Sequence, residues 1–159
     1  GPESLIIDME IKKRVAIKRM SLDIEYYNQI FKRQVLAFAL HGRQLTSNES
    51  FIPLPNQYRL GGTRTLRGYR EDQFRGSSIG WINLEYRYIL GRRSRAFIFT
   101  DMGYYNSLTR TGKTEGYKIG YGFGFRLETG LGIMGVDYGM GEGDGLLNGK
   151  VHVGLVNEF

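Results

Sequence analysis

Hydrophobic and polar residues alternate one by one along most of the chain, which is the pattern of β-strands with one apolar face. In the first such run, Leu5, Ile7 and Met9 alternate with Asp8 and Glu10. The same period of two recurs along the chain and predicts eight strands in all. These strands are expected over residues 5–13, 20–27, 34–42, 82–90, 96–102, 117–127, 134–140 and 151–159.

Segments that resemble turns separate most of these runs. They cover residues 28–32, 91–93, 105–115 and 142–149. We therefore expect an all-β protein in which antiparallel strands follow one another in chain order. The string Gly139–Gly145 is interpreted as a hairpin tip rather than a phosphate or calcium loop, because no helix follows it and the ligand spacing is absent.

The alternation leaves open whether the apolar face points into a protein core or outward into lipid. Three features favour a transmembrane β-barrel, whose apolar face is outside. The polar face of residues 117–127 holds Gly120, Gly122 and Gly124, which leave space inside a crowded lumen. That face also mixes charges of both signs, which suits an ion-paired interior. Tyrosines gather near the predicted strand ends, as at a membrane interface: Tyr26, Tyr27, Tyr86, Tyr88, Tyr104, Tyr105, Tyr117 and Tyr138.

Composition narrows the alternatives. The chain has 159 residues and no cysteine, so a disulfide scaffold and thiolate chemistry are excluded. Its net charge of +6 is spread along the chain, and we expect no nucleic-acid partner. His41 and His152 are too far apart in sequence to suggest a metal site or a triad, so no enzyme, metal or cofactor is expected. Gly1 and Pro2 resemble a remnant of tag cleavage, and residues 3–159 are expected to form one barrel domain.

Residues 43–77 hold no alternating run and form a connection of unusual length. Two prolines, Pro53 and Pro55, lie in its first half. Its second half places glycines next to apolar and aromatic residues, which indicates a loop that folds back and packs against the sheet.

Two motifs in this loop resemble a known signature. Gly61-Gly62 and Leu66-Arg67-Gly68-Tyr69 are similar to the "GG…[VLI]RG[FY]" pattern of the outer-membrane assembly-factor superfamily. That superfamily includes BamA, the two-partner-secretion transporters, the bacterial surface antigen barrels and the chloroplast envelope import channel. Further similarities follow in the family's order: an inward glutamate at Glu85, an F-x-D-x-G strand at Phe99–Gly103, alternating glycines before an arginine at Gly120–Arg126, and a terminal aromatic at Phe159.

The resemblance implies roles for particular residues. Arg67 is expected to latch the loop onto Glu85 and Asp101, since one guanidinium can pair with two carboxylates. Gly68 would let the loop backbone approach the wall closely, and Tyr69 would wedge against wall side chains. Loop packing is assigned to Gly61, Gly62 and Leu66, and the signal for assembly to Gly154, Leu155 and Phe159. Asn157 departs from the apolar or aromatic residue that the family prefers at that position.

The family barrel has sixteen strands, usually preceded by periplasmic POTRA-type domains, and the resemblance covers only its last eight strands. Eight tilted strands enclose an interior that side chains alone fill, which leaves no space for a latched loop. The chain could close alone with the loop outside, or be a fragment of a larger barrel. We favour a third solution, in which two copies pair edge to edge into a sixteen-strand barrel.

The expected function follows from the resemblance: a bacterial outer-membrane barrel that acts non-covalently as a pore or as an insertion or translocation element. Its expected partners are outer-membrane lipid, a second copy of the chain, the barrel-assembly machinery and unfolded protein substrates. Two alternatives stay open at this point, a passive small-solute pore and a soluble basic β-barrel that binds a ligand.

Overall fold

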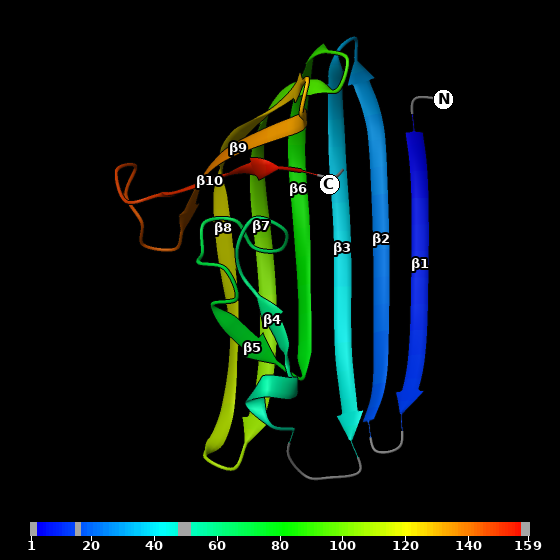
Figure 1. Ribbon diagram of the computed structural model, residues 1–159, viewed down its shortest axis with the longest axis vertical. Coiled ribbons are helices and arrows are strands. Elements are labelled where there is room, and N and C mark those ends of the chain that lie inside the picture. The colour runs from blue at the N-terminus through cyan, green and yellow to red at the C-terminus, as the bar shows by residue number, and fades with distance from the viewer. Residues whose placement is uncertain (1–2, 15–16, 48–51, 157–159) are drawn as a thin grey trace.

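Eight antiparallel strands form one sheet whose spatial order is the order of the chain, as the alternation predicted. The computed structural model describes residues 3–14, 17–47 and 52–156. The strands of this sheet are β1 (Glu3–Arg14), β2 (Ile17–Phe31), β3 (Gln34–Ser47), β6 (Ser78–Gly91), β7 (Ser94–Thr109), β8 (Gly112–Thr129), β9 (Gly132–Gly141) and β10 (Lys150–Leu155). Figure 1 shows most of them as long, nearly parallel ribbons.

The sheet is open, with β1 and β10 as its two edges. The edges differ in length, because β1 has 12 residues and β10 has 6. The chain thus shows an all-β antiparallel sheet but does not by itself close into the barrel that the sequence led us to expect.

The long connection between β3 and β6 folds back over one face of the sheet, where β4 and β5 lie across the longer strands (Figure 1). It contains the 3₁₀ helix η1 (Leu54–Asn56) and the short hairpin of β4 (Tyr58–Leu60) and β5 (Phe74–Gly76). The described part of the chain contains no helix of the length and apolarity needed to cross a membrane.

Several predicted boundaries were wrong. The connection begins after Ser47 rather than at residue 43, because β3 pairs with β2 as far as Ser47. Residues 105–115 are mostly strand, since the β7–β8 ladder continues to the pair Thr109 and Gly112. Backbone hydrogen bonds extend this hairpin where the apolar alternation has already stopped.

Near the C-terminus, Gly139 and Gly141 belong to β9, so the hairpin connection covers residues 142–149 only. The last predicted strand, residues 151–159, ends at Leu155 in the structure. Asn157 and Phe159 lie outside the described residues.

The two faces of the sheet differ in polarity. On the face away from the folded-back connection, the alternating apolar side chains are half-buried on β2 and β3 and mostly exposed on the other strands, for example Leu5, Ile98 and Val153 at 60–65%. We call this the outer face, and the face that the connection covers the inner face. Tyr27 and Tyr105 belong to the inner face rather than to an interfacial ring of tyrosines, since Tyr27 lies beneath the buried Arg87 guanidinium and Tyr105 is 9% exposed.

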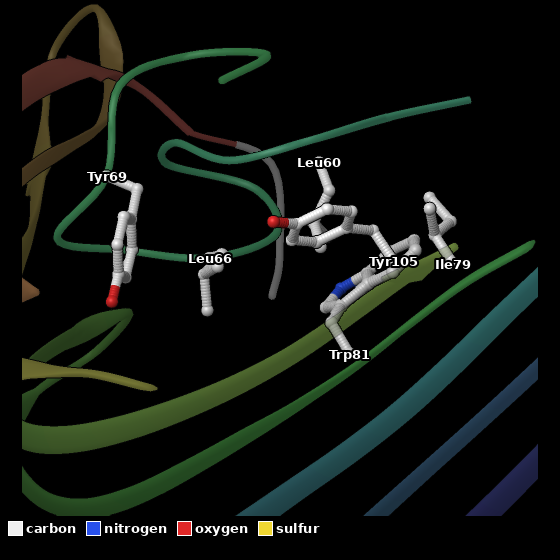
Figure 2. Packing of buried hydrophobic residues seen from close by; sticks show 6 residues of the cluster. All are labelled: Leu60, Leu66, Tyr69, Ile79, Trp81 and Tyr105. Carbon is white, nitrogen blue, oxygen red and sulfur yellow. The ribbon is translucent and has the colours of Figure 1, made fainter. Parts of the chain in front are cut away.

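Inner-face packing joins the connection to the sheet. Leu60, Leu66 and Tyr69 of the connection form one buried cluster with Ile79 and Trp81 of β6 and Tyr105 of β7. Figure 2 shows these six side chains between the connection and the strands beneath it. Burying a large apolar side chain contributes about 1.5–3 kcal/mol, so this cluster stabilises the folded-back path of the connection.

Candidate functional site: a buried arginine latch

Arg67 joins the connection to two strands of the sheet through a set of charged hydrogen bonds. Its Nε and Nη2 atoms each donate to one oxygen of Asp101 on β7, at 2.7 Å. Its backbone N–H also donates to Asp101 Oδ2, at 2.9 Å. Its remaining terminal nitrogen, Nη1, donates to Glu85 Oε2 on β6, at 2.5 Å. One guanidinium therefore serves two carboxylates on neighbouring strands.

All three charged groups are removed from solvent. Arg67 is 2% exposed, Glu85 1% and Asp101 0%. Burial by itself lowers the pKa of the Arg67 guanidinium, but the adjacent charges of Asp101 and Glu85 outweigh burial and raise the pKa above its ordinary value. The guanidinium therefore stays charged at any physiological pH. The two buried carboxylates need this charge, because a buried charge without a partner is strongly destabilising.

Neighbouring polar groups complete the network. Arg87 Nε donates to Glu85 Oε1 at 2.9 Å, so each oxygen of Glu85 accepts from a different arginine. Asn83 Nδ2 donates to the carbonyl oxygen of Thr65 at 2.9 Å, two residues before Arg67. Two residues of β6 thus hold the connection: Glu85 binds the Arg67 side chain, and Asn83 binds the backbone at Thr65.

Glycines of β8 let the connection lie against the sheet. A Cβ atom at Gly120 would overlap the carbonyl oxygen of Arg67, so no other residue fits there without moving the connection. Gly68 itself has φ +99°, and a Cβ on it would lie 2.6 Å from the carbonyl oxygen of Met140 on β9. Close backbone approach and a left-handed conformation both require glycine at position 68.

Two phenylalanines of β7 form a floor for the guanidinium. The Cζ atom of Arg67 lies 3.9 Å from the ring centroid of Phe99 and 5.7 Å from that of Phe97. These rings lie opposite Gly122 and Gly124 on β8, where a Cβ would be within 3.0 Å of each ring. The alternating glycines therefore give the rings space to lie flat beneath the cation, an arrangement that adds cation–π attraction.

Tyr69 anchors the connection to the end of the β8–β9 pairing. Its hydroxyl donates to the carbonyl oxygen of Ile119 at 2.9 Å and accepts from the backbone N–H of Glu142 at 3.0 Å. Burial raises the pKa of Tyr69, while the hydrogen bond from Glu142 acts in the opposite direction. The hydroxyl therefore remains protonated and able to donate.

The remaining loop residues shape the turn that precedes the latch. Gly61 N–H donates to Thr65 Oγ1 at 2.8 Å, and Gly62 N–H donates to the Leu66 carbonyl oxygen at 2.9 Å. Both glycines have positive φ. Leu66 is fully buried in the apolar cluster, directly before Arg67.

Comparison with known proteins shows the family to which the chain belongs. A family model described as the Omp85 superfamily domain matches residues 11–159. The chain belongs to the Omp85 superfamily. No curated protein was found to match it. Membership of the Omp85 superfamily suggests a role in the assembly or translocation of outer-membrane proteins.

Beyond the residues that the Omp85 signature indicated, the structure shows a second buried ion pair. Arg126 of β8 donates from Nη1 and Nη2 to the two oxygens of Asp137 on β9, at 2.5 and 3.1 Å. Its Cζ atom lies 4.8 Å from the ring centroid of Phe97, which therefore contacts both Arg67 and Arg126. The sequence offered only the arginine after the alternating glycines as a signal, and Asp137 was not anticipated.

A cavity of about 710 Å³ lies on the inner face beside the latch. Its lining includes Asp8 of β1, Arg64 of the connection and His152 of β10. Both edges of the sheet therefore border one polar space. Within residues 3–14, 17–47 and 52–156, no group of three or more His, Asp or Glu side chains is arranged to hold a metal ion.

Two of the residues assigned to the assembly signal, Gly154 and Leu155, border the cavity beside the latch. Gly154 and Leu155 are in edge strand β10, and Leu155 is 61% exposed on the outer face. Phe159, the third of them, is among the residues that the structure does not describe.

Proposed function

We propose that this chain forms the wall of a transmembrane β-barrel in the bacterial outer membrane, and that it acts non-covalently in the insertion or translocation of outer-membrane proteins. The observation that carries the proposal is the exposed outer face, on which apolar side chains alternate along every long strand. On β8 alone, Tyr121, Phe123 and Phe125 are 42–45% exposed. A soluble protein rarely leaves such a large contiguous apolar surface in water, whereas hydrocarbon solvates it.

The polarity of the inner face supports the same orientation. Several of its charged groups are paired with each other, as in the sets around Arg67 and Arg126. A water-filled or protein-filled lumen accommodates such groups, while lipid would not. The proposal therefore places the connection inside the lumen and the alternating apolar residues against lipid.

We further propose that two copies close the barrel. Each copy leaves β1 and β10 without a partner strand, and an unpaired backbone group in lipid costs several kcal/mol. Because eight strands alternate in direction, β1 and β10 run in opposite directions and can pair antiparallel across a two-fold axis. Every one of the sixteen strands then has a neighbour on both sides, and the barrel encloses enough space for two folded-back connections.

The two seams of such a barrel would be its weakest joints. Within the described residues, β10 offers 6 residues for pairing and β1 offers 12, so half of β1 would lack a described partner at each seam. A substrate strand can add to such an edge by main-chain hydrogen bonds. We propose that this seam is where unfolded barrel proteins meet the chain, with the barrel-assembly machinery as a further partner.

In this proposal Arg67 has the role of a latch. It holds the connection against the barrel wall through Asp101 and Glu85, while Gly68 and Tyr69 fit the connection to β8 and β9. The network is non-covalent and contains no activated nucleophile, so its contribution is to fix the shape of the lumen rather than to carry out chemistry.

A second candidate function is a passive pore for small solutes. The polar cavity of about 710 Å³ beside the connection favours it, since charged side chains line the space between the two edges. A pore of this kind needs no protein substrate and no opening of a seam.

One experiment separates these functions. Purified protein is reconstituted in liposomes, and two quantities are measured: ion conductance and the insertion rate of an unfolded outer-membrane barrel protein. We expect the chain to accelerate insertion. A disulfide across the seam, between a cysteine in residues 4–8 of β1 and one in residues 151–155 of β10, should abolish the acceleration. The wild-type chain has no cysteine of its own, so the introduced pair is the only source of a disulfide, and the mass of the product under non-reducing conditions distinguishes a bridge between two copies from one within a copy.

Other outcomes are equally informative. Conductance without any acceleration of insertion would support the passive pore. A chain that remains monodisperse without detergent would contradict both functions and favour a soluble ligand-binding barrel. Particle mass in detergent tests the dimer, since one chain has a mass of 18.2 kDa and a closed pair has twice that mass.

A further inference from the structure

Two tight turns at one end of the sheet each present a pair of basic residues. The β2–β3 turn consists of Lys32 and Arg33, and the β6–β7 turn of Arg92 and Arg93. Strands β3 and β6 are neighbours, and the backbone N–H of Ile89 donates to the carbonyl oxygen of Arg33 at 2.7 Å. The two turns therefore lie next to each other, at the upper end of the sheet in Figure 1. We call these four residues the basic rim.

All four side chains of the basic rim are exposed. Within the described residues, none of them forms an ion pair with a carboxylate. Among residues 3–14, 17–47 and 52–156, the acidic residues nearest this end of the sheet are Glu3 at the start of β1 and Glu128 near the end of β8. Positive charge therefore predominates at this end among the residues that the structure describes.

The backbone of these turns shows that the arginines are placed at some cost. Arg33 has φ 63° and Arg93 has φ 51°, a conformation in which glycine or asparagine is favoured. The β7–β8 and β8–β9 turns of the same sheet have glycine at their positive-φ residues, Gly112 and Gly132. Those two glycines follow their turns, with φ 138° and 126°, a conformation that other residues rarely adopt, whereas Arg33 and Arg93 lie in the left-handed α region, which arginine adopts at a small cost. Glycine would lower this cost at positions 33 and 93, where the chain has arginine instead.

Apolar side chains flank the basic rim. Phe31 is 64% exposed directly before Lys32, Leu90 is 47% exposed just before the β6–β7 turn, and Leu131 is 85% exposed at the tip of the β8–β9 turn. Exposed apolar groups beside cations are typical of a surface at the boundary between hydrocarbon and headgroups.

We propose that the basic rim binds the phosphate groups of anionic phospholipids in the leaflet that surrounds this end of the barrel. The inference rests on the membrane orientation proposed above. Charge complementarity supports it, since clustered Lys and Arg at a membrane surface attract anionic headgroups. The three turns at this end are short, as the periplasmic turns of outer-membrane barrels are, which assigns the rim to the phospholipid leaflet.

Spin-labelled lipids test the proposal. The protein is reconstituted in phosphatidylcholine bilayers with trace amounts of phosphatidylglycerol or phosphatidylcholine labelled near the end of the acyl chain. Electron spin resonance then gives the fraction of each lipid that is immobilised at the protein. We expect phosphatidylglycerol to associate at least about twofold more strongly than phosphatidylcholine, with a preference that declines in high salt.

Two double variants test whether the basic rim causes the preference for phosphatidylglycerol. Arg33→Gly with Arg93→Gly should lower the lipid preference while leaving the urea midpoint of unfolding unchanged or higher, because glycine relieves both turns. Lys32→Gln with Arg92→Gln should also lower the lipid preference, and it leaves Arg33 and Arg93, the two residues with positive φ, in place. Lys18→Gln with Arg19→Gln removes two exposed cations near the opposite end of the sheet and is the matched control for total charge.

An unchanged preference in both rim variants, or an equal loss in the control, would overturn the proposal. If no immobilised lipid is detected for the wild-type protein, the membrane orientation itself is wrong. Immobilised lipid without any headgroup preference instead leaves the barrel intact and rejects only the lipid site.

Discussion

Arg67 and Asp101 are joined by three hydrogen bonds although 34 residues separate them along the chain. Two come from the guanidinium and one from the backbone of the same arginine, so Asp101 fixes both the side chain and the path of the connection. Bidentate pairs of this kind are stronger and more directional than single contacts. The connection between β3 and β6 is therefore positioned by a residue on β7 in addition to the contacts that it makes with β6.

Arg67→Ala is expected to loosen the connection while the eight-stranded sheet remains. The change leaves two buried carboxylates without their shared cation, which costs about 3–5 kcal/mol. Urea unfolding measures this loss, and limited proteolysis of residues 52–77 reports the loosened connection. The control is Arg64→Ala, an exposed residue three positions earlier. Equal protease resistance in the wild-type protein and Arg67→Ala would contradict a latch.

Gly120→Ala should displace the connection by a steric effect alone. The added methyl group would overlap the Arg67 carbonyl oxygen, and overpacking of this kind costs about 1–3 kcal/mol. Gly42→Ala on β3 is the matched control, because no atom lies within 4 Å of a Cβ there. Gly120→Ala should lower the free energy of unfolding, whereas Gly42→Ala should leave it unchanged or raise it slightly. Two changes of equal size would indicate a general effect of alanine in these strands.

Tyr69→Phe should leave the backbone N–H of Glu142 and the carbonyl oxygen of Ile119 without their bridging hydroxyl. Losing partners of this kind typically costs about 1–3 kcal/mol. Hydrogen exchange at the Glu142 amide measures the loss directly and should accelerate. Tyr58→Phe serves as the control, since the Tyr58 hydroxyl forms no hydrogen bond with another residue that the structure describes. Unchanged exchange at Glu142 would rule out the bridge in solution.

Single spin labels test the orientation of the sheet. Labels at Leu84, Phe123 and Val153 on the outer face should collide with oxygen dissolved in lipid and be shielded from a water-soluble nickel complex. A label at Asp8, which lines the inner cavity, should show the opposite preference. If all four labels report water, the outer face does not contact lipid.

Much of the architecture could be predicted from the sequence because alternation is a local property of a strand. It located the strands, their order and the inward side of Glu85. The prediction was wrong over residues 105–115, where the β7–β8 hairpin contains Asn106 paired with Glu115. Backbone pairing persists there without an apolar face, and no alternation marks it.

The latch was only partly visible in the sequence. The motif around Arg67 and its resemblance to a family drew attention to Glu85 and Asp101, which the structure brings together. The floor formed by Phe97 and Phe99 was not predicted, because alternation puts these two aromatic residues on the same side as Asp101, where a polar lumen is expected. Only the position of the guanidinium explains why two aromatic rings lie on that side.

The sequence by itself determined the period of the strands, their antiparallel order and the types of residue available to hold the long connection, since these depend on neighbours within a few positions. Only the tertiary structure decided which carboxylates Arg67 meets, that Asp137 pairs with Arg126, and that β1 and β10 are left as edges of unequal length. Those outcomes depend on strand register and on the path of the connection, which bring together groups that are far apart in the chain.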